Sequence, residues 1–178
     1  MHAIKVLRED HARIETLLNG LADQAATPTK PAERLERELV VHILAEDNVF
    51  LPYVQEAVED GNPMTEELFG ADPGVLVVAT GLVAQSYETN VWIQDLLRGL
   101  PPVPTRREIE DLREAVELHI ELGEDLFQKA QVVLEEEDFE RIGDLIEHCK
   151  WQVRGLAQAR LASSSSFEPS PARVTLLE

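Results

Sequence analysis

Three histidines and one glutamate lie within the apolar stripes of predicted helices, where polar side chains need a partner. His42 and Glu46 are four residues apart, slightly more than one helical turn, so both side chains point in the same direction. His11 and His119 hold comparable positions in two other predicted helices. Buried imidazole and carboxylate groups either pair with each other or hold a metal ion. The pattern therefore predicts a shared metal site, with structural burial of the histidines as the alternative.

The elements that carry these residues are predicted to be helices, because apolar residues recur every three or four positions. The predicted helices cover residues 2–23, 32–60, 75–98, 105–136 and 139–161. Thr105, followed by Glu108, is expected to form a capping box at the start of the fourth helix. Pro52 lies inside the second helix and is expected to kink it, since proline cannot donate a hydrogen bond to residue 48.

The predicted fold is all-α, an antiparallel up-and-down four-helix bundle with an additional C-terminal helix. We expect one domain over residues 1–161 and a disordered polar tail over residues 162–178, which opens with four serines. Eight aliphatic side chains are expected in the core: Leu7, Leu18, Leu39, Val49, Ile93, Leu97, Leu122 and Leu126. Each contributes roughly 1.5–3 kcal/mol on burial, so the bundle is expected to be stable without metal.

The composition excludes several classes of partner and site. The net charge of -18 repels nucleic acid and anionic lipid. No apolar run approaches the roughly 20 residues that span a bilayer, and charges appear too early in the sequence for a signal peptide. We therefore expect a cytoplasmic protein with neither nucleic-acid nor membrane partners. The single cysteine, Cys149, excludes an intrachain disulfide and a cysteine-based metal site.

The segments that carry the histidines resemble the hemerythrin-like family, the HHE cation-binding domains. Residues 6–14 look like the opening helix of that family, and residues 118–127 resemble its fourth-helix motif. Residues 39–52 are similar to the second motif, including the closing Pro52. The resemblance covers about residues 1–160 in the order that the family has. Ferritin-like di-iron bundles use Glu-x-x-His instead, whereas this chain has His-x-x-x-Glu.

The resemblance implies a four-helix bundle that holds two irons bridged by oxygen and carboxylates. The ligands that carry over by matching motifs are His11, His42, Glu46 and His119. The third-helix histidine of the family falls on Asn90, and its second carboxylate falls on Gly123. Glu124 is the neighbouring carboxylate and a fifth candidate ligand. It would need a local bulge, because one residue turns a helical side chain by about 100°.

The function implied by the resemblance is that of a non-heme iron protein that binds or senses O2, NO or peroxide, or holds iron. Three histidines and one glutamate suffice for one ion, so one or two irons are expected, and Zn or Mn would also suit these ligands. One alternative is a metal-free helical bundle that acts through protein partners. A weaker alternative is a hydrolase in which Zn or Fe activates water. Whether the protein is an enzyme is left open.

Three other residues have less specific signals. Glu15 lies one turn after His11 and is a further candidate ligand, although a solvated surface carboxylate is the expected reading. His148 lies beside Cys149, a pair that can indicate nucleophilic catalysis. No third catalytic member accompanies this pair, so we expect helix packing there.

Overall fold

The described part of the chain consists of helices joined by short connections, as the sequence predicts. The structure, a computed structural model, describes residues 1–23, 29–59 and 73–165. Its helices are α1 (Ala3–Asp23), α2 (Thr29–Ala45), the π-helical turn η1 (Glu46–Phe50), α3 (Leu51–Glu59), α5 (Pro73–Gly99), α6 (Arg106–Val133) and α7 (Glu136–Ser165). The all-α class is therefore confirmed. Within these residues, no helix is long and apolar enough to cross a membrane.

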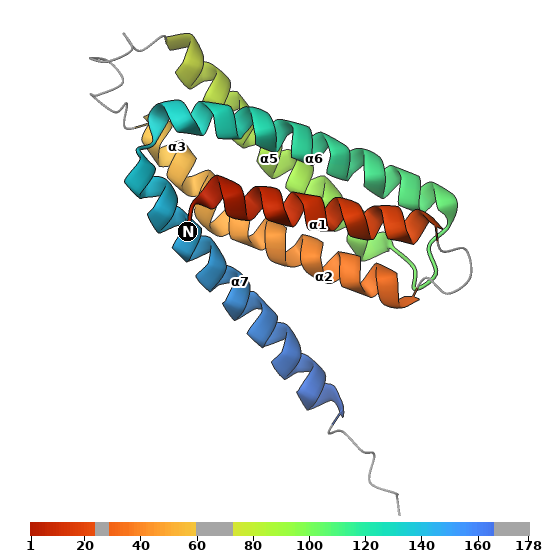
Figure 1. Cartoon of the computed structure of the whole chain (residues 1–178). Coiled ribbons are helices and arrows are strands. Elements are labelled where there is room, and N and C mark those ends of the chain that lie inside the picture. The colour runs from red at the N-terminus through yellow and green to blue at the C-terminus, as the bar shows by residue number, and fades with distance from the viewer. Residues whose placement is uncertain (24–28, 60–72, 166–178) are drawn as a thin grey trace, which may run out of the picture.

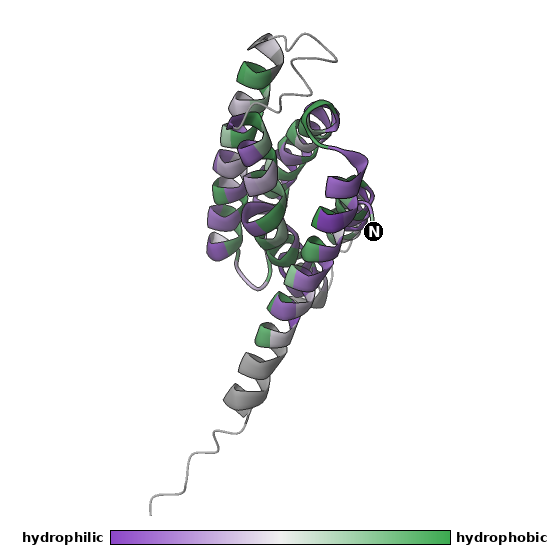
Figure 2. Cartoon of the chain, turned by 90° about the vertical axis from the view of Figure 1, so that its left-hand side faces the viewer, coloured by the Kyte–Doolittle hydropathy of each residue, from purple (hydrophilic) through white to green (hydrophobic). Residues whose placement is uncertain are grey.

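Four helical rods form the bundle. Figure 1 shows α1, α5, α6 and the rod made of α2, η1 and α3 lying side by side. Helix α1 packs against α2, and α5 packs against α6 along their length. The fifth rod, α7, packs across α1 and α2, and its C-terminal end projects beyond the bundle in Figures 1 and 2. The predicted four-helix bundle with an additional C-terminal helix is confirmed.

A capping box and a run of acidic residues explain where α6 and α7 begin. The Thr105 hydroxyl accepts a hydrogen bond from the Glu108 backbone N–H at 3.3 Å, and the Glu108 carboxylate accepts one from the Thr105 N–H at 2.6 Å. This is the predicted capping box. Helix α6 ends at Val133, and α7 starts with three acidic residues that suit the positive end of its dipole.

The irregularity expected at Pro52 takes the form of a π-helical turn. Residues 46–50 are wound more widely than an α-helix, and the Leu51 N–H donates to the carbonyl of Glu46, five residues earlier. The wider turn precedes Pro52, which lacks the N–H that a regular helix would use there. Glu46 is the first residue of this turn, so the turn begins at a candidate ligand.

Helix α7 is longer than the sequence analysis expects. It continues to Ser165, past the predicted end at residue 161, so residues 162–165 are helical rather than part of the tail. Serine is only moderately less favourable than alanine in a helix, and an existing helix extends at little cost. The rest of the predicted tail, residues 166–178, lies outside the described residues.

The core has two apolar layers with a polar layer between them. One apolar layer contains Leu7, Phe50, Leu126 and Phe127, and the other contains Leu18, Leu39, Ile93 and Leu97. Of the eight predicted core residues, only Leu122 is half-buried rather than buried. The buried polar side chains of the described residues are Asp10, His11, His42, Glu46, Ser86, Thr89, Asn90, His119 and Lys150. In α1, α5 and α6 they fall between residues of the two apolar layers.

Candidate metal centre

Four side chains from four elements converge in the polar layer. His11 comes from α1, His42 from α2, Glu46 from the start of η1, and His119 from α6. Each residue is at most 3% exposed. One donor atom from each residue lies within 4.8 Å of the donors of the other three. The structure thus brings together four of the five ligands named from the sequence.

The distances between these donor atoms suit one metal ion. The Nε2 atoms of His42 and His119 are 3.0 Å apart. Glu46 Oε1 lies 3.5 Å from His42 Nε2, and Glu46 Oε2 lies 3.5 Å from His119 Nε2. His11 Nε2 lies 3.9 Å from Glu46 Oε1. A tetrahedral ion with bonds of about 2.0–2.1 Å holds its donors about 3.4 Å apart, which lies within this range.

Several ring nitrogens of the cluster have no hydrogen-bond partner among the described residues. Both nitrogens of His11 are unpartnered, as are the Nδ1 atoms of His42 and His119. The His11 ring instead stacks on Phe127, with ring centroids 5.9 Å apart. A buried polar group without a partner is costly, and native proteins contain few of them. A cation bound at Nε2 of His11 would give this buried nitrogen a partner. The residues therefore fit a metal ion.

Burial sets the protonation state of the cluster. Burial and, to a smaller extent, the nearby His42 together lower the pKa of His119 to about 3. Burial also lowers the pKa of His11 well below the usual value, with added repulsion from His42 and His119. Both imidazoles are therefore neutral at neutral pH, the form that binds a metal. Burial raises the pKa of Glu46, against the opposing effects of His42 and Asn90.

The fifth predicted ligand, Glu124, lies outside the cluster. Its carboxylate accepts two hydrogen bonds from Arg8 Nε, at 2.9 and 3.1 Å, and one from Arg8 Nη2 at 2.6 Å. Its side chain is partly exposed. Helix α6 is continuous through this region, so no bulge turns Glu124 inward. Its role as a ligand stays a prediction that this geometry does not favour.

The neighbouring Gly123 gives the His11 ring its space. A Cβ atom at position 123 would lie 3.1 Å from His11 Cε1 and 3.8 Å from Phe127 Cζ. The ring of the first-helix histidine therefore fills the position where the hemerythrin-like pattern would have a second carboxylate. In the described residues, one cluster of metal-binding side chains is present, and it has donors for one ion.

The third bundle helix, α5, contributes an amide rather than a ligand. Asn90 is fully buried, and its Nδ2 atom donates to Asp47 Oδ1 at 2.8 Å. Its Oδ1 atom has no partner. Glu15 is exposed, as expected for a solvated carboxylate. His148 is also exposed and contacts Gln152 rather than Cys149, so no catalytic pair forms there.

The sequence analysis missed two buried charged residues beside the cluster. Asp10 and Lys150 are each 4% exposed. Lys150 Nζ lies 3.0 and 2.9 Å from the two Asp10 oxygens, and Asp10 Oδ2 lies 3.5 Å from His42 Nδ1. Burial would raise the pKa of Asp10, but hydrogen bonding with His42 and Lys150 lowers it overall. One signal was available, because Lys150 follows Ile146 by one turn inside the apolar stripe of α7.

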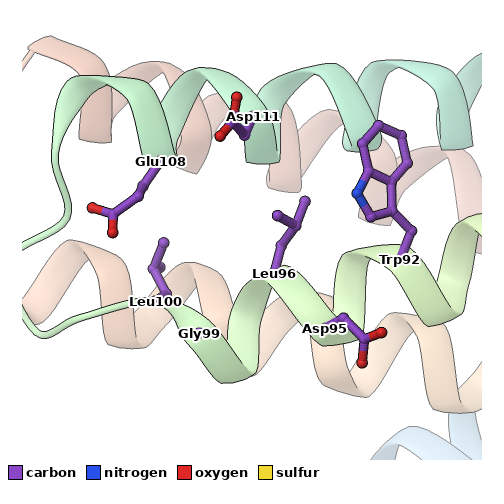
Figure 3. A pocket seen from close by; sticks show the side chains of 7 residues that line it. All are labelled: Trp92, Asp95, Leu96, Gly99, Leu100, Glu108 and Asp111. Atoms are coloured by element: carbon purple, nitrogen blue, oxygen red, sulfur yellow. The ribbon is translucent and has the colours of Figure 1, made fainter.

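Two surface pockets of the described residues lie away from this centre. One of about 260 Å³ lies between α5 and α6 and is shown in Figure 3. It is lined by Trp92, Asp95, Leu96, Gly99, Leu100, Glu108 and Asp111. Another of about 220 Å³ is lined by residues of α2 and α5, among them Val40 and Gln94. None of the four cluster residues lines either of these two pockets, and each of the four is at most 3% exposed.

Comparison with known proteins gives one structural relative. No family model and no curated protein matches the sequence. A crystal structure of a hemerythrin HHE cation binding domain-containing protein from Mycobacterium kansasii matches with a TM-score of 0.61 and 19% sequence identity. The match covers 91% of this chain and 93% of that chain. The chain therefore has the hemerythrin-like helical-bundle fold that its motifs predict, and within it a histidine and glutamate cluster that supports metal binding.

Proposed function

We propose that the protein binds one non-heme iron ion through His11, His42, Glu46 and His119. The observation that carries the proposal is the convergence of these four buried donors, with several of their nitrogens unpartnered. Imidazole and carboxylate ligands suit iron, zinc and manganese. The resemblance to the hemerythrin-like family favours iron among them.

The proposal of one ion rather than two rests on three positions. Asn90 stands where the family pattern has a third-helix histidine, and Gly123 stands where it has a carboxylate. Glu124 pairs with Arg8 and is not among the clustered donors. A second ion would therefore have too few donors.

In this proposal, some residues of the centre would bind iron and others would contact a small ligand or exclude water. The three imidazoles would supply nitrogen donors, and Glu46 would supply one negative charge. Iron, when bound, supplies redox chemistry and a coordination position for a small molecule. Asn90 Oδ1, which is buried and unpartnered, would accept a hydrogen bond from a water or from a protonated ligand. Phe50 and Phe127 pack edge to face beside His11 and help to exclude bulk water.

The enclosure of the centre favours a diatomic ligand or peroxide over a larger substrate. The four cluster residues are at most 3% exposed, and neither pocket described above reaches them, so a small ligand would enter through fluctuations in packing. O2 and NO are small and uncharged, and hydrogen peroxide is nearly as small. The hydrolase alternative needs room for a larger substrate next to the metal, which this arrangement does not offer.

A matched pair of histidine variants tests the proposal. Wild type, His42→Ala and His148→Ala would be loaded anaerobically with Fe(II), passed through gel filtration and analysed for metal by mass spectrometry. We expect His42→Ala to lose most of the iron and His148→Ala to retain as much as wild type, because His148 is exposed. Addition of NO should change the visible spectrum of the loaded wild type only when iron is retained.

The opposite results would overturn the proposal in two distinct ways. Equal iron content in wild type and His42→Ala would mean that the ion binds elsewhere. A fully helical wild-type protein that retains no iron would instead support the metal-free alternative, in which the bundle acts through protein partners.

A further inference from the structure

Helix α7, the additional helix of the fold, contributes a buried charge to the surroundings of the candidate centre. Lys150 is 4% exposed, and its Nζ atom lies within 3.0 Å of both oxygens of Asp10 on α1. It also lies 2.6 Å from Glu147 Oε1 on its own helix. A buried ammonium group is costly unless it is paired, so this contact fixes both the position of Asp10 and the docking of α7.

Asp10 in turn faces the back of a ligand ring. Its Oδ2 atom lies 3.5 Å from His42 Nδ1, slightly beyond the length of a standard hydrogen bond. The other ring nitrogen, Nε2, faces Glu46 and His119. The two nitrogens of His42 therefore have different surroundings, a carboxylate at Nδ1 and the donor cluster at Nε2.

We propose that Asp10, held by Lys150 of α7, positions His42 with its proton on Nδ1 and its lone pair on Nε2. Asp10 accepts the Nδ1 proton in a hydrogen bond, so Nε2 is left free to act as a donor to a metal. A carboxylate behind a histidine ligand fixes the ring tautomer and orientation in many metal sites. Both residues are positioning residues, since neither reaches the cluster itself.

The contact between His42 and His119 means that the proposal also determines the tautomer of His119 in the metal-free protein. Their Nε2 atoms are 3.0 Å apart, so one of them must carry the proton that joins them. With the His42 proton on Nδ1, the donor must be His119 Nε2–H. The two histidines are then opposite tautomers before metal binds, and His119 must change tautomer when a metal occupies Nε2.

The docking of α7 offers a matched control for Lys150. Arg154 on the same helix lies 3.2 Å from Glu38 Oε2 of α2, and Glu38 in turn pairs with Arg13, which donates to Asp10 Oδ1 at 3.2 Å. Lys150→Met and Arg154→Met each remove one cation from the contact between α7 and the bundle. Only the first removes a partner of Asp10.

The first readout is the ¹⁵N chemical shift of each imidazole nitrogen in metal-free protein, which separates protonated from unprotonated nitrogens. We expect His42 as the Nδ1–H tautomer and His119 as the Nε2–H tautomer in wild type and in Arg154→Met. In Lys150→Met the His42 shifts should move toward a mixture of tautomers. An Nε2–H tautomer for His42 in wild type would overturn the proposal, as would shifts that Lys150→Met leaves unchanged.

The second readout is the affinity for Zn(II), measured by chelator competition because zinc is not redox-active. We expect Lys150→Met to weaken binding about 10- to 100-fold and Arg154→Met to bind as wild type does. If Lys150→Met fails to fold, the double variant Asp10→Leu with Lys150→Met replaces the buried pair with apolar groups of similar size. This variant should fold and show the same loss of affinity and of tautomer preference, and wild-type values in it would contradict the proposal.

This inference rests on the proposed metal site, but the two fail differently. Tight Zn(II) binding that is unaffected by Lys150→Met would overturn the positioning role and leave the metal site intact. Absence of metal binding, together with the expected tautomers, would overturn the metal site and leave the Asp10 and His42 relationship intact.

Discussion

The ring of His11 lies in the space that a side chain at Gly123 would need. A Cβ atom there would be 3.1 Å from His11 Cε1, closer than ordinary van der Waals contact. The glycine therefore has a specific role at this position, which is to allow a candidate ligand from α1 to approach α6 closely. The same relationship removes a carboxylate that a second ion would require.

Gly123→Ala is expected to weaken metal binding more than it changes stability. The new methyl group pushes the His11 ring by a few tenths of an ångström. Overpacking costs about 1–3 kcal/mol, and the gain in helix propensity offsets up to about 1 kcal/mol of that. We expect a several-fold loss of Zn(II) affinity in chelator competition. Gly81→Ala on α5 is the control, because nothing lies within 4 Å of its Cβ; it should retain wild-type affinity.

Glu46→Gln should separate metal binding from folding. The amide keeps the size of the side chain but removes the only charged ligand of the cluster. We expect Zn(II) affinity to fall by more than about 100-fold. Loss of a residue that only hydrogen-bonds to a ligand typically lowers metal affinity by about 10- to 100-fold. Since burial disfavours the carboxylate, metal-free stability should be unchanged or higher in urea unfolding.

Glu124→Gln is the control for that experiment and tests the remaining predicted ligand. Its partly exposed pair with Arg8 contributes at most about 1 kcal/mol. We expect wild-type metal affinity and nearly wild-type stability. A loss of affinity comparable to that of Glu46→Gln would mean that Glu124 turns inward when metal binds.

The metal-free protein should lose stability on mild acidification. An unfolded histidine titrates near 6.5, whereas the pKa of folded His119 is about 3 and that of His11 is also well below 6.5. Below pH 6.5 the unfolded chain therefore binds protons that the folded chain does not, and acid favours unfolding. Glu46, whose pKa is raised, binds a proton more readily when folded and offsets one of the two histidines at most.

The net loss should be on the order of 1 kcal/mol per pH unit between pH 6.5 and 5.5. Urea unfolding with a chelator present at pH 7.5, 6.5 and 5.5 would measure it. His119→Leu should flatten the dependence, and His148→Gln should leave it unchanged because His148 is exposed. Stability that rises between pH 6.5 and 5.5 would show that the buried histidines are already protonated in the folded state.

The contact between the first residue and α7 should limit substitution at Gly143. A Cβ there would lie 1.6 Å from the Met1 carbonyl oxygen, so the backbone must move. The Met1 ammonium group also pairs with Asp144 at 2.9 Å. We expect Gly143→Ala to lower the free energy of unfolding by about 1–3 kcal/mol. Gly155→Ala on the same helix, with nothing within 4 Å, should raise it by up to about 1 kcal/mol.

The sequence was sufficient to predict the helices and most of the cluster. Apolar periodicity shows which face of each helix is buried, so a polar residue such as His11 or His119 stands out on that face. The spacing of His42 and Glu46 brings both to one side of the same rod. The four side chains converge because α1, α6 and the rod of α2 and η1 meet at one level of the core.

The partners of Asp10 and Glu124 and the π-helical turn could not be predicted, because they depend on contacts and geometry that the apolar pattern of one helix does not contain. Periodicity does not reveal which residue of α7 meets Asp10, since Lys150 is 140 positions away along the chain. Periodicity also does not predict the ion pair between Arg8 and Glu124. The π-helical turn at Glu46 changes the direction of side chains by part of a turn, and nothing besides Pro52 signals it in the sequence.

The most direct test of the central claim is the number of iron ions in wild-type protein after anaerobic loading with Fe(II) and gel filtration. Metal analysis by mass spectrometry, set against protein concentration from amino-acid analysis, gives that number. We expect one ion per chain, because the cluster offers three histidine nitrogens and one carboxylate. Two ions per chain would contradict this account, since they would require ligands beyond His11, His42, Glu46 and His119.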